Sequence, residues 1–236
     1  AQQLAFFDLL YLHRQSPFMR PNYQWEALGN AYAEPACPAD HHVILDLIRR
    51  YEGAESARIG AHWLAHQPGA FTVFRSPTEP IVGFGCTLEL AQMSAEQRAA
   101  DPLVAAAWAY TTRSAPVQRG ELMTYDRFWG GTRKKHDPAV VALLMMQSMC
   151  KWLLSAAPLS WDLMANPISD EAELASLDAM FAYLNYQRLP AAECVVGGAP
   201  IAVWGHDWRA EPIDAWLDLM AQRELATTLT EVREVS

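Results

Sequence analysis

One stretch of the chain decides the fold class to expect. Residues 137–165 read DPAVVALLMMQSMCKWLLSAAPLSWDLMA. Asp137 and Pro138 form a strong helix start, and residues 139–154 are apolar on almost every side, which predicts a largely buried helix. Residues 160–165 can form a central strand directly after it. Because parallel strands need a crossover that covers the sheet, this stretch predicts an α/β fold with a parallel central pair.

The segments on either side extend this pattern. Before it, the sequence predicts helices over 42–51 and 54–66, a hairpin over 71–75 and 81–90, helices from 94 and from 102, and a strand over 121–128. After it come a helix that Asp170 can cap, a hairpin with arms over 193–196 and 201–204 joined by Gly197 and Gly198, and a helix from Pro212. We expect three parts: an N-terminal arm over 1–39 with a short helix over 4–14, a main domain over 40–208, and a C-terminal helix and tail over 209–236.

Composition excludes several function classes. Hydrophobic residues make up 51% and charged residues 19% of the 236 residues, as in a compact globular protein. The net charge of −9 would repel a polyphosphate backbone, so we expect no nucleic-acid partner. No apolar run is long enough to span a bilayer and no signal peptide is evident, so we expect no membrane partner and a cytoplasmic location.

Cysteine and histidine spacing gives no metal or disulfide framework. The four cysteines, at 37, 86, 150 and 194, are far apart and lack Cys-x-x-Cys spacing. His62 and His66 have a spacing that can place two imidazoles on one helix face, but no third ligand is identifiable. We therefore expect no metal. The sequence also lacks a Gly-x-Ser-x-Gly elbow, a Walker loop and a full Gly-x-Gly-x-x-Gly motif, which disfavours hydrolase and nucleotide-fold interpretations.

The order of helices, hairpin, strand, buried helix, strand, helix and hairpin over residues 40–208 resembles the GNAT superfamily of acyl-CoA-dependent N-acyltransferases. The resemblance implies a mixed, mostly antiparallel central sheet flanked by helices, behind an N-terminal helical and irregular arm. It also implies acetyl-CoA or another acyl-CoA as co-substrate, and a small-molecule or peptide amine as acceptor. A homodimer, or a partner domain in the same polypeptide, is left open.

A partial match to the family's coenzyme A loop lies at residues 127–132, RFWGGT. In the family, an Arg/Gln-x-x-Gly-x-Gly/Ala loop holds the coenzyme A pyrophosphate with backbone N–H groups and the following helix N-terminus. Arg127 and Gly130 occupy the first and fourth positions, Gly131 follows, and Thr132 replaces the final small residue. The basic residues Arg133, Lys134 and Lys135 follow and could attract phosphate. The resemblance implies that Arg127, Gly130, Gly131 and Thr132 bind the cofactor, and the charges of the three basic residues add Arg133, Lys134 and Lys135 as candidate contacts.

The candidate catalytic residues are two carboxylates and two tyrosines. The resemblance implies a Tyr that protonates the departing thiolate, but Phe181 stands at that position. Tyr183 or Tyr186 could take the role, because each carries a phenol. Glu121 or Asp126 could act as general base toward an ammonium substrate, and alternation along the strand lets at most one of them serve.

Two functions of different classes are open at this point. The first is N-acyl transfer by direct attack of an amine on the thioester. The second is a noncatalytic GNAT-like sensing or interaction module, perhaps cut from a larger regulatory protein. The altered glycine loop, Phe181 in place of the proton donor, and the aromatic residues of the N-terminal arm favour the second.

Overall fold

The computed structural model describes residues 31–234, and within them the chain forms one mixed sheet. The strands are β1 (Tyr32–Pro35), β2 (Phe71–Arg75), β3 (Gly83–Glu89), β4 (Leu122–Gly131), β5 (Leu159–Pro167), β6 (Gln187–Arg188), β7 (Cys194–Val196) and β8 (Ala199–Asp207). The order across the sheet is β1-β2-β3-β4-β5-β8-β6, and β7 pairs with β8. Only the central pair β4–β5 is parallel among these pairings. The predicted mixed, mostly antiparallel sheet is confirmed.

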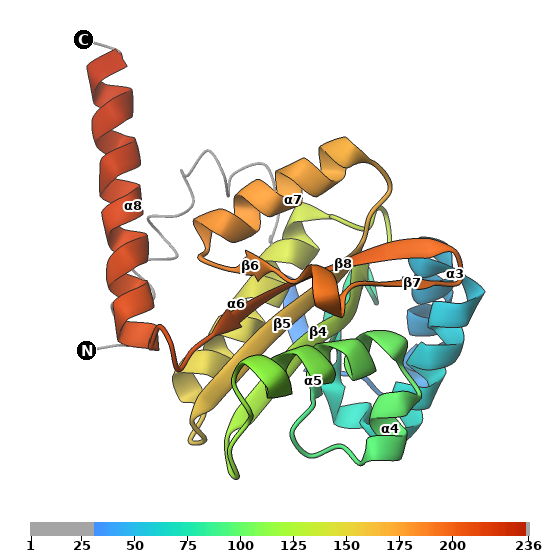
Figure 1. Ribbon diagram of the computed structural model, residues 1–236. Coiled ribbons are helices and arrows are strands. Elements are labelled where there is room, and N and C mark those ends of the chain that lie inside the picture. The colour runs from blue at the N-terminus through green and yellow to red at the C-terminus, as the bar shows by residue number, and fades with distance from the viewer. Residues whose placement is uncertain (1–30, 235–236) are drawn as a thin grey trace.

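Helices cover both faces of this sheet (Figure 1). On one face lie α3 (His41–His66), α4 (Ala95–Ala99) and α5 (Pro102–Ser114); on the other lie the crossover helix α6 (Pro138–Leu154) and α7 (Glu171–Tyr183). The last helix, α8 (Ile213–Glu234), packs beside the second group through Trp216 and Met220. Three short 3-10 turns occupy Pro38–Asp40, Pro68–Ala70 and Pro190–Ala192.

Local sequence signals account for where these elements begin and turn. The carboxylates of Asp101, Asp137 and Asp170 each accept a hydrogen bond from a backbone N–H in the first turn of α5, α6 and α7. Gly53, at φ 89°, kinks α3 between the two predicted helices. Gly197 and Gly198 both have positive φ, as a two-residue hairpin turn requires.

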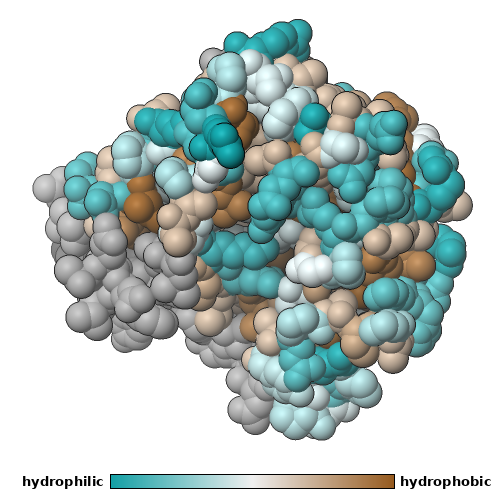
Figure 2. All heavy atoms as spheres, turned by 90° about the horizontal axis from the view of Figure 1, so that it is seen from below, coloured by the Kyte–Doolittle hydropathy of each residue, from teal (hydrophilic) through white to brown (hydrophobic). Residues whose placement is uncertain are grey.

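Buried side chains form a core on each face of the sheet. The first packs α3 and α5 on the sheet around residues such as Ile44, Trp63 and Phe128; the second packs α6, α7 and α8 around Phe181 and Trp204. The face shown in Figure 2 is mostly hydrophilic, with apolar residues scattered among polar ones. The two cores hold the two helical layers on one sheet.

The N-terminal part differs from its prediction where it is described. Residues 32–35, expected to be irregular, form edge strand β1 antiparallel to β2. Pro35 lacks a backbone N–H and therefore argues against a strand in the sequence, but an edge strand tolerates it. The helix predicted over 4–14 lies outside the described residues, and the division into three parts stays a prediction. No helix among residues 31–234 is long and apolar enough to cross a bilayer.

Candidate active site between the central strands

The two parallel central strands separate partway along their length. Their pairing ends at Asp126 and Met164, although β4 continues to Gly131 and β5 to Pro167. Trp129 spans the gap, because its indole Nε1 donates a hydrogen bond to the carbonyl oxygen of Ala165 at 3.3 Å. The separation of the strands thus leaves space on the α6–α7 side of the sheet. Side chains, and not paired backbone, line this space.

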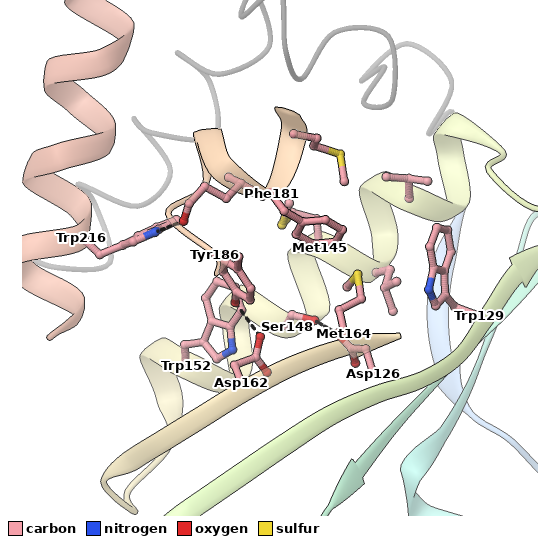
Figure 3. Close-up of a pocket in the computed structure, with 14 residues that line it drawn as sticks. Asp126, Trp129, Met145, Ser148, Trp152, Asp162, Met164, Phe181, Tyr186 and Trp216 are labelled. Carbon is pink, nitrogen blue, oxygen red and sulfur yellow. Dashed lines mark hydrogen bonds between the residues drawn. The ribbon is translucent and has the colours of Figure 1, made fainter. Parts of the chain in front are cut away.

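A cavity of about 50 Å³ occupies this space (Figure 3). Its walls are almost entirely apolar and aromatic, and the lining residues are Asp126, Trp129, Val141, Leu144, Met145, Ser148, Trp152, Asp162, Met164, Met180, Phe181, Leu184, Tyr186 and Trp216. A site for one water needs roughly 10–15 Å³ on the same kind of measure, so the cavity has room for a group of several heavy atoms.

Two buried carboxylic acids lie at the floor of the cavity, one from each central strand (Figure 3). Asp126 accepts hydrogen bonds from the Thr87 hydroxyl at 2.5 Å and the Ser148 hydroxyl at 3.2 Å. Asp162 accepts one from Thr124 and one from the Tyr186 phenol, the latter at 2.6 Å. Each of the four carboxylate oxygens therefore accepts one hydroxyl hydrogen bond.

These surroundings shift the acidities toward neutral pH. Burial, and then the Asp126 carboxylate, raise the pKa of Asp162 to about 7. Burial also raises the pKa of Asp126, while Lys151 and the two hydroxyl donors act against it. Burial and the adjacent Asp162 raise the pKa of Tyr186 well above its ordinary value. The site therefore combines one acid, Asp162, that can hold or release a proton near pH 7 with a phenol that stays protonated.

The glycines expected to hold pyrophosphate are part of strand β4. Gly130 and Gly131 pair with Phe84 and Gly83 of β3. A Cβ at Gly130 would meet the Tyr51 ring at 3.0 Å, and one at Gly131 would meet the Lys134 carbonyl oxygen at 2.7 Å. The missing side chains thus make room for the protein's own groups.

The backbone donors of this segment are also occupied. The Gly131 N–H donates to Lys135 and the Thr132 N–H to Val82. The N-terminus of α6 is capped by the Asp137 carboxylate, which would repel a phosphate placed there. This arrangement disfavours a pyrophosphate cradle at Gly130, Gly131 and Thr132, whose role in cofactor binding stays a prediction.

The cations of the segment divide into buried and exposed ones. Arg127 is fully buried between Glu52 and Asp101, at 3.1 and 2.8 Å, so its charge is engaged inside the protein and its predicted contact with phosphate stays a prediction. Lys135 lies beside Glu52, and burial lowers its pKa to about 8. Arg133 and Lys134 are exposed, and Arg133 pairs with Glu79. Only these last two present charge to an approaching phosphate.

The four predicted catalytic residues are not brought to one place. Asp126 and Tyr186 both line the cavity and are linked through Asp162. Glu121 lies just before β4, paired with Arg209 at 3.4 Å, and does not line the cavity. Tyr183 donates its phenol hydrogen to Glu224 of α8. The structure therefore places one carboxylate and one tyrosine of the predicted set at the cavity.

Sequence reasoning missed Asp162, Thr124 and Ser148. Asp162 offered the clearest signal, because an acid in the middle of the apolar strand segment 160–165 must be buried with specific partners. The two hydroxyl residues carried none, since Ser and Thr are common in helices and strands. Among the described residues, no group of three or more His, Cys, Asp or Glu side chains is placed to hold a metal ion.

The mostly antiparallel sheet, the parallel pair β4–β5 and the crossover helix α6 agree with the arrangement that the resemblance to the GNAT superfamily implies. No protein-family model matches the sequence, and no curated protein does. Solved structures with a similar arrangement include Arabidopsis thaliana NAA60 in complex with acetyl-CoA, with a TM-score of 0.47 and 8% identity, covering 76% of this chain and 99% of that one. Another is the NatC complex bound to Gag peptide and CoA, with a TM-score of 0.46 and 11% identity over 75% of this chain and 98% of that one.

A third, a GNAT-family acetyltransferase from Bacillus cereus, has a TM-score of 0.41 and 11% identity over 76% of this chain and 98% of that one. These values describe a similar arrangement of elements, and the function has to be argued from the site itself.

Proposed function

We propose that the chain is an N-acyltransferase that moves an acyl group from a thioester donor to an amine. The observation that carries the proposal is the Asp126–Asp162–Tyr186 arrangement in the cavity where the parallel strands part. Acyl transfer to an ammonium substrate needs a group that takes a proton near neutral pH and a group that gives one. A buried acid with a pKa of about 7 beside a protonated phenol supplies both.

The chain's own residues would handle the protons as follows. The ionised carboxylate of Asp162 accepts a proton from the substrate ammonium, which frees the nitrogen lone pair to attack the acyl carbon. When the carbon–sulfur bond breaks, the Tyr186 phenol donates its proton to the leaving sulfur. Asp162 returns a proton to the Tyr186 oxygen through the hydrogen bond that already joins them at 2.6 Å. The proton released by the new amide passes to solvent.

The donor is expected to be acyl-CoA, and the structure fits its phosphates only in part. Arg133 and Lys134 are exposed beside the start of α6 and could meet them, whereas the backbone of 130–132 is already engaged. We therefore assign no role in phosphate binding to Arg127, Gly130, Gly131 or Thr132. Arg133 and Lys134 remain proposed contacts.

An acyl-transfer assay tests the proposal directly. Thiol release from acetyl-CoA is followed with a panel of primary amines, for the intact protein and for Asp162→Asn, Tyr186→Phe and the exposed control Asp46→Asn. We expect kcat/KM to fall by about 10²- to 10⁴-fold in Asp162→Asn, the range for loss of a general base. Asp46→Asn should match the intact protein. Activity that survives unchanged in both site variants would rule out this assignment of roles.

The engaged glycine segment favours a second candidate, a noncatalytic GNAT-like sensing or interaction module. A domain with no place for pyrophosphate could still use its cavity to recognise a ligand. Absence of product with every amine, together with absence of acetyl-CoA binding at millimolar concentration, would select this candidate.

A further inference from the structure

The cavity combines two features that rarely occur together, and both restrict the ligand. Its walls are built from aromatic and sulfur-containing side chains, including Trp152, Met164 and Phe181, which favour hydrocarbon and can also face a cation. Its floor carries the carboxylates of Asp126 and Asp162. A ligand that matches both must have an apolar body and one end that interacts with an acid.

The charge of the groups around the two carboxylates indicates the chemical nature of the ligand's polar end. Among the described residues, no Lys, Arg or His forms an ion pair with Asp126 or Asp162. Lys151 acts on both carboxylates from beyond ion-pair distance. Two buried carboxylates without an ion-paired cation are costly once they ionise, and an apolar ligand would leave that cost in place. A ligand that carries positive charge would remove it.

We infer that the cavity binds a small primary amine with an apolar carbon skeleton, its ammonium group on the Asp126–Asp162 floor and its hydrocarbon against the aromatic walls. This rests on the proposed function, because it names the acceptor class for the same site. The binding itself does not require the transfer reaction.

A metal ion fits the site less well than an amine. Each carboxylate oxygen already accepts a hydroxyl hydrogen bond, and the remaining lining is almost entirely apolar, whereas Mg²⁺ and Ca²⁺ require six or more oxygen ligands. An ammonium group needs fewer contacts and tolerates an aromatic environment. Magnesium is therefore a competitor to be tested.

Binding of the amine should strengthen as pH rises through neutrality. An ionised floor is needed to hold a cation, and the groups that act on Asp162 are Asp126 from β4, Lys151 from α6 and the Tyr186 phenol after α7. A simple alkylamine stays protonated in this range, because its pKa resembles that of lysine, about 10.4. The protein, rather than the ligand, should therefore set the pH dependence.

The test is isothermal titration with butylamine and with 1-butanol, its neutral counterpart, at pH 6 and pH 8.5. The proteins compared are the intact chain, Asp162→Asn and the exposed control Asp46→Asn. We expect butylamine to bind at least ten-fold more tightly at pH 8.5 than at pH 6, and at least ten-fold more tightly than 1-butanol. Asp162→Asn should lose this preference and Asp46→Asn should keep it.

A second measurement uses only the intact protein, so it does not depend on whether a variant folds. Titration of the intact protein with butylamine near pH 7, in two buffers of different ionisation enthalpy, should show release of protons as the cation binds. Equal affinity for 1-butanol, no proton release, or displacement of butylamine by millimolar Mg²⁺ would each overturn the inference. Butylamine that binds but is never acylated would reject the proposed transfer reaction alone, and acylated amines that do not bind here would reject the inference alone.

Discussion

At the scale of single residues, Asp162 should make the stability of the fold depend on pH. Its pKa is about 7 in the folded protein against an ordinary 3.8, so both states are protonated below the lower value. Between the two values the unfolded chain gives up the proton first, and the free energy of unfolding falls as pH rises, by at most about 4 kcal/mol. Asp162→Asn cannot ionise and should lack this contribution.

Urea unfolding at pH 5 and pH 8 measures the effect. The intact protein should lose more stability between these pH values than Asp162→Asn does, and Asp46→Asn should follow the intact protein. Parallel pH profiles for the intact protein and Asp162→Asn would mean that the acid is not shifted as its burial implies.

Arg127 should also affect the stability of the fold, because its charge is buried and paired with Glu52 and Asp101. Removing a fully buried charge leaves Glu52 and Asp101 uncompensated, and breaking such a group costs roughly 3–5 kcal/mol. Arg127→Met should therefore lower the free energy of unfolding by about that much, while the exposed Arg133→Ala changes it little. If Arg127→Met folded with full stability and lost only acyl-CoA affinity, the phosphate role predicted from the sequence would return.

The residue scale also shows what a single sequence could not reveal about the site. Asp126 and Tyr186 were predictable from their element and their chemistry. The burial of Arg127 was not predictable from the motif that singled it out, because β4 bulges there: Asp126 pairs with Thr87 and Phe128 with Cys86, which leaves Arg127 without a partner in β3. Arg127 and Phe128 consequently both face α3 and α5, contrary to strict alternation.

At the scale of elements, the close approach of α6 to the sheet depends on Gly83. A Cβ there would lie 2.4 Å from Val140 Cγ2 and 2.8 Å from the Gly130 carbonyl oxygen, which is backbone and cannot turn away. Gly83→Ala should therefore destabilise the fold by about 1–3 kcal/mol, the usual cost of overpacking. Gly69→Ala is the matched control, because nothing lies within 4 Å of its added carbon. Equal stability of the two variants in urea would contradict this packing.

Element order was more predictable than element environment. Long apolar segments with a clear helix start, such as 139–154, and turn signals such as Gly197 and Gly198, directly encode local geometry, and the structure confirms them. The surroundings of the glycine segment were not predictable, because a Gly pair looks the same in the sequence whether it admits a phosphate or a neighbouring ring. Its use depends on Tyr51, roughly 80 residues away in the chain.

At the scale of the whole molecule, two cores share one sheet, which should make their unfolding cooperative. Strand β5 contributes side chains to both, and β4 contributes to the first core and lines the cavity beside the second, so neither helical layer can detach without exposing the other face of the same strands. We expect tryptophan fluorescence and far-ultraviolet circular dichroism to report one coincident urea transition.

Truncation on either face should then shift that single transition. Ile44 lies in the α3 core and Met220 in the α8 contact, and both are fully buried. Ile44→Ala and Met220→Ala should each lower the free energy of unfolding by about 2–5 kcal/mol without separating the two signals. If Met220→Ala instead produced an early second transition while the sheet stayed intact, α8 would be a separate unit, as the predicted boundary at 208 and 209 proposes. A common shift would make α8, with Trp216 on the cavity wall, part of the body that holds the site.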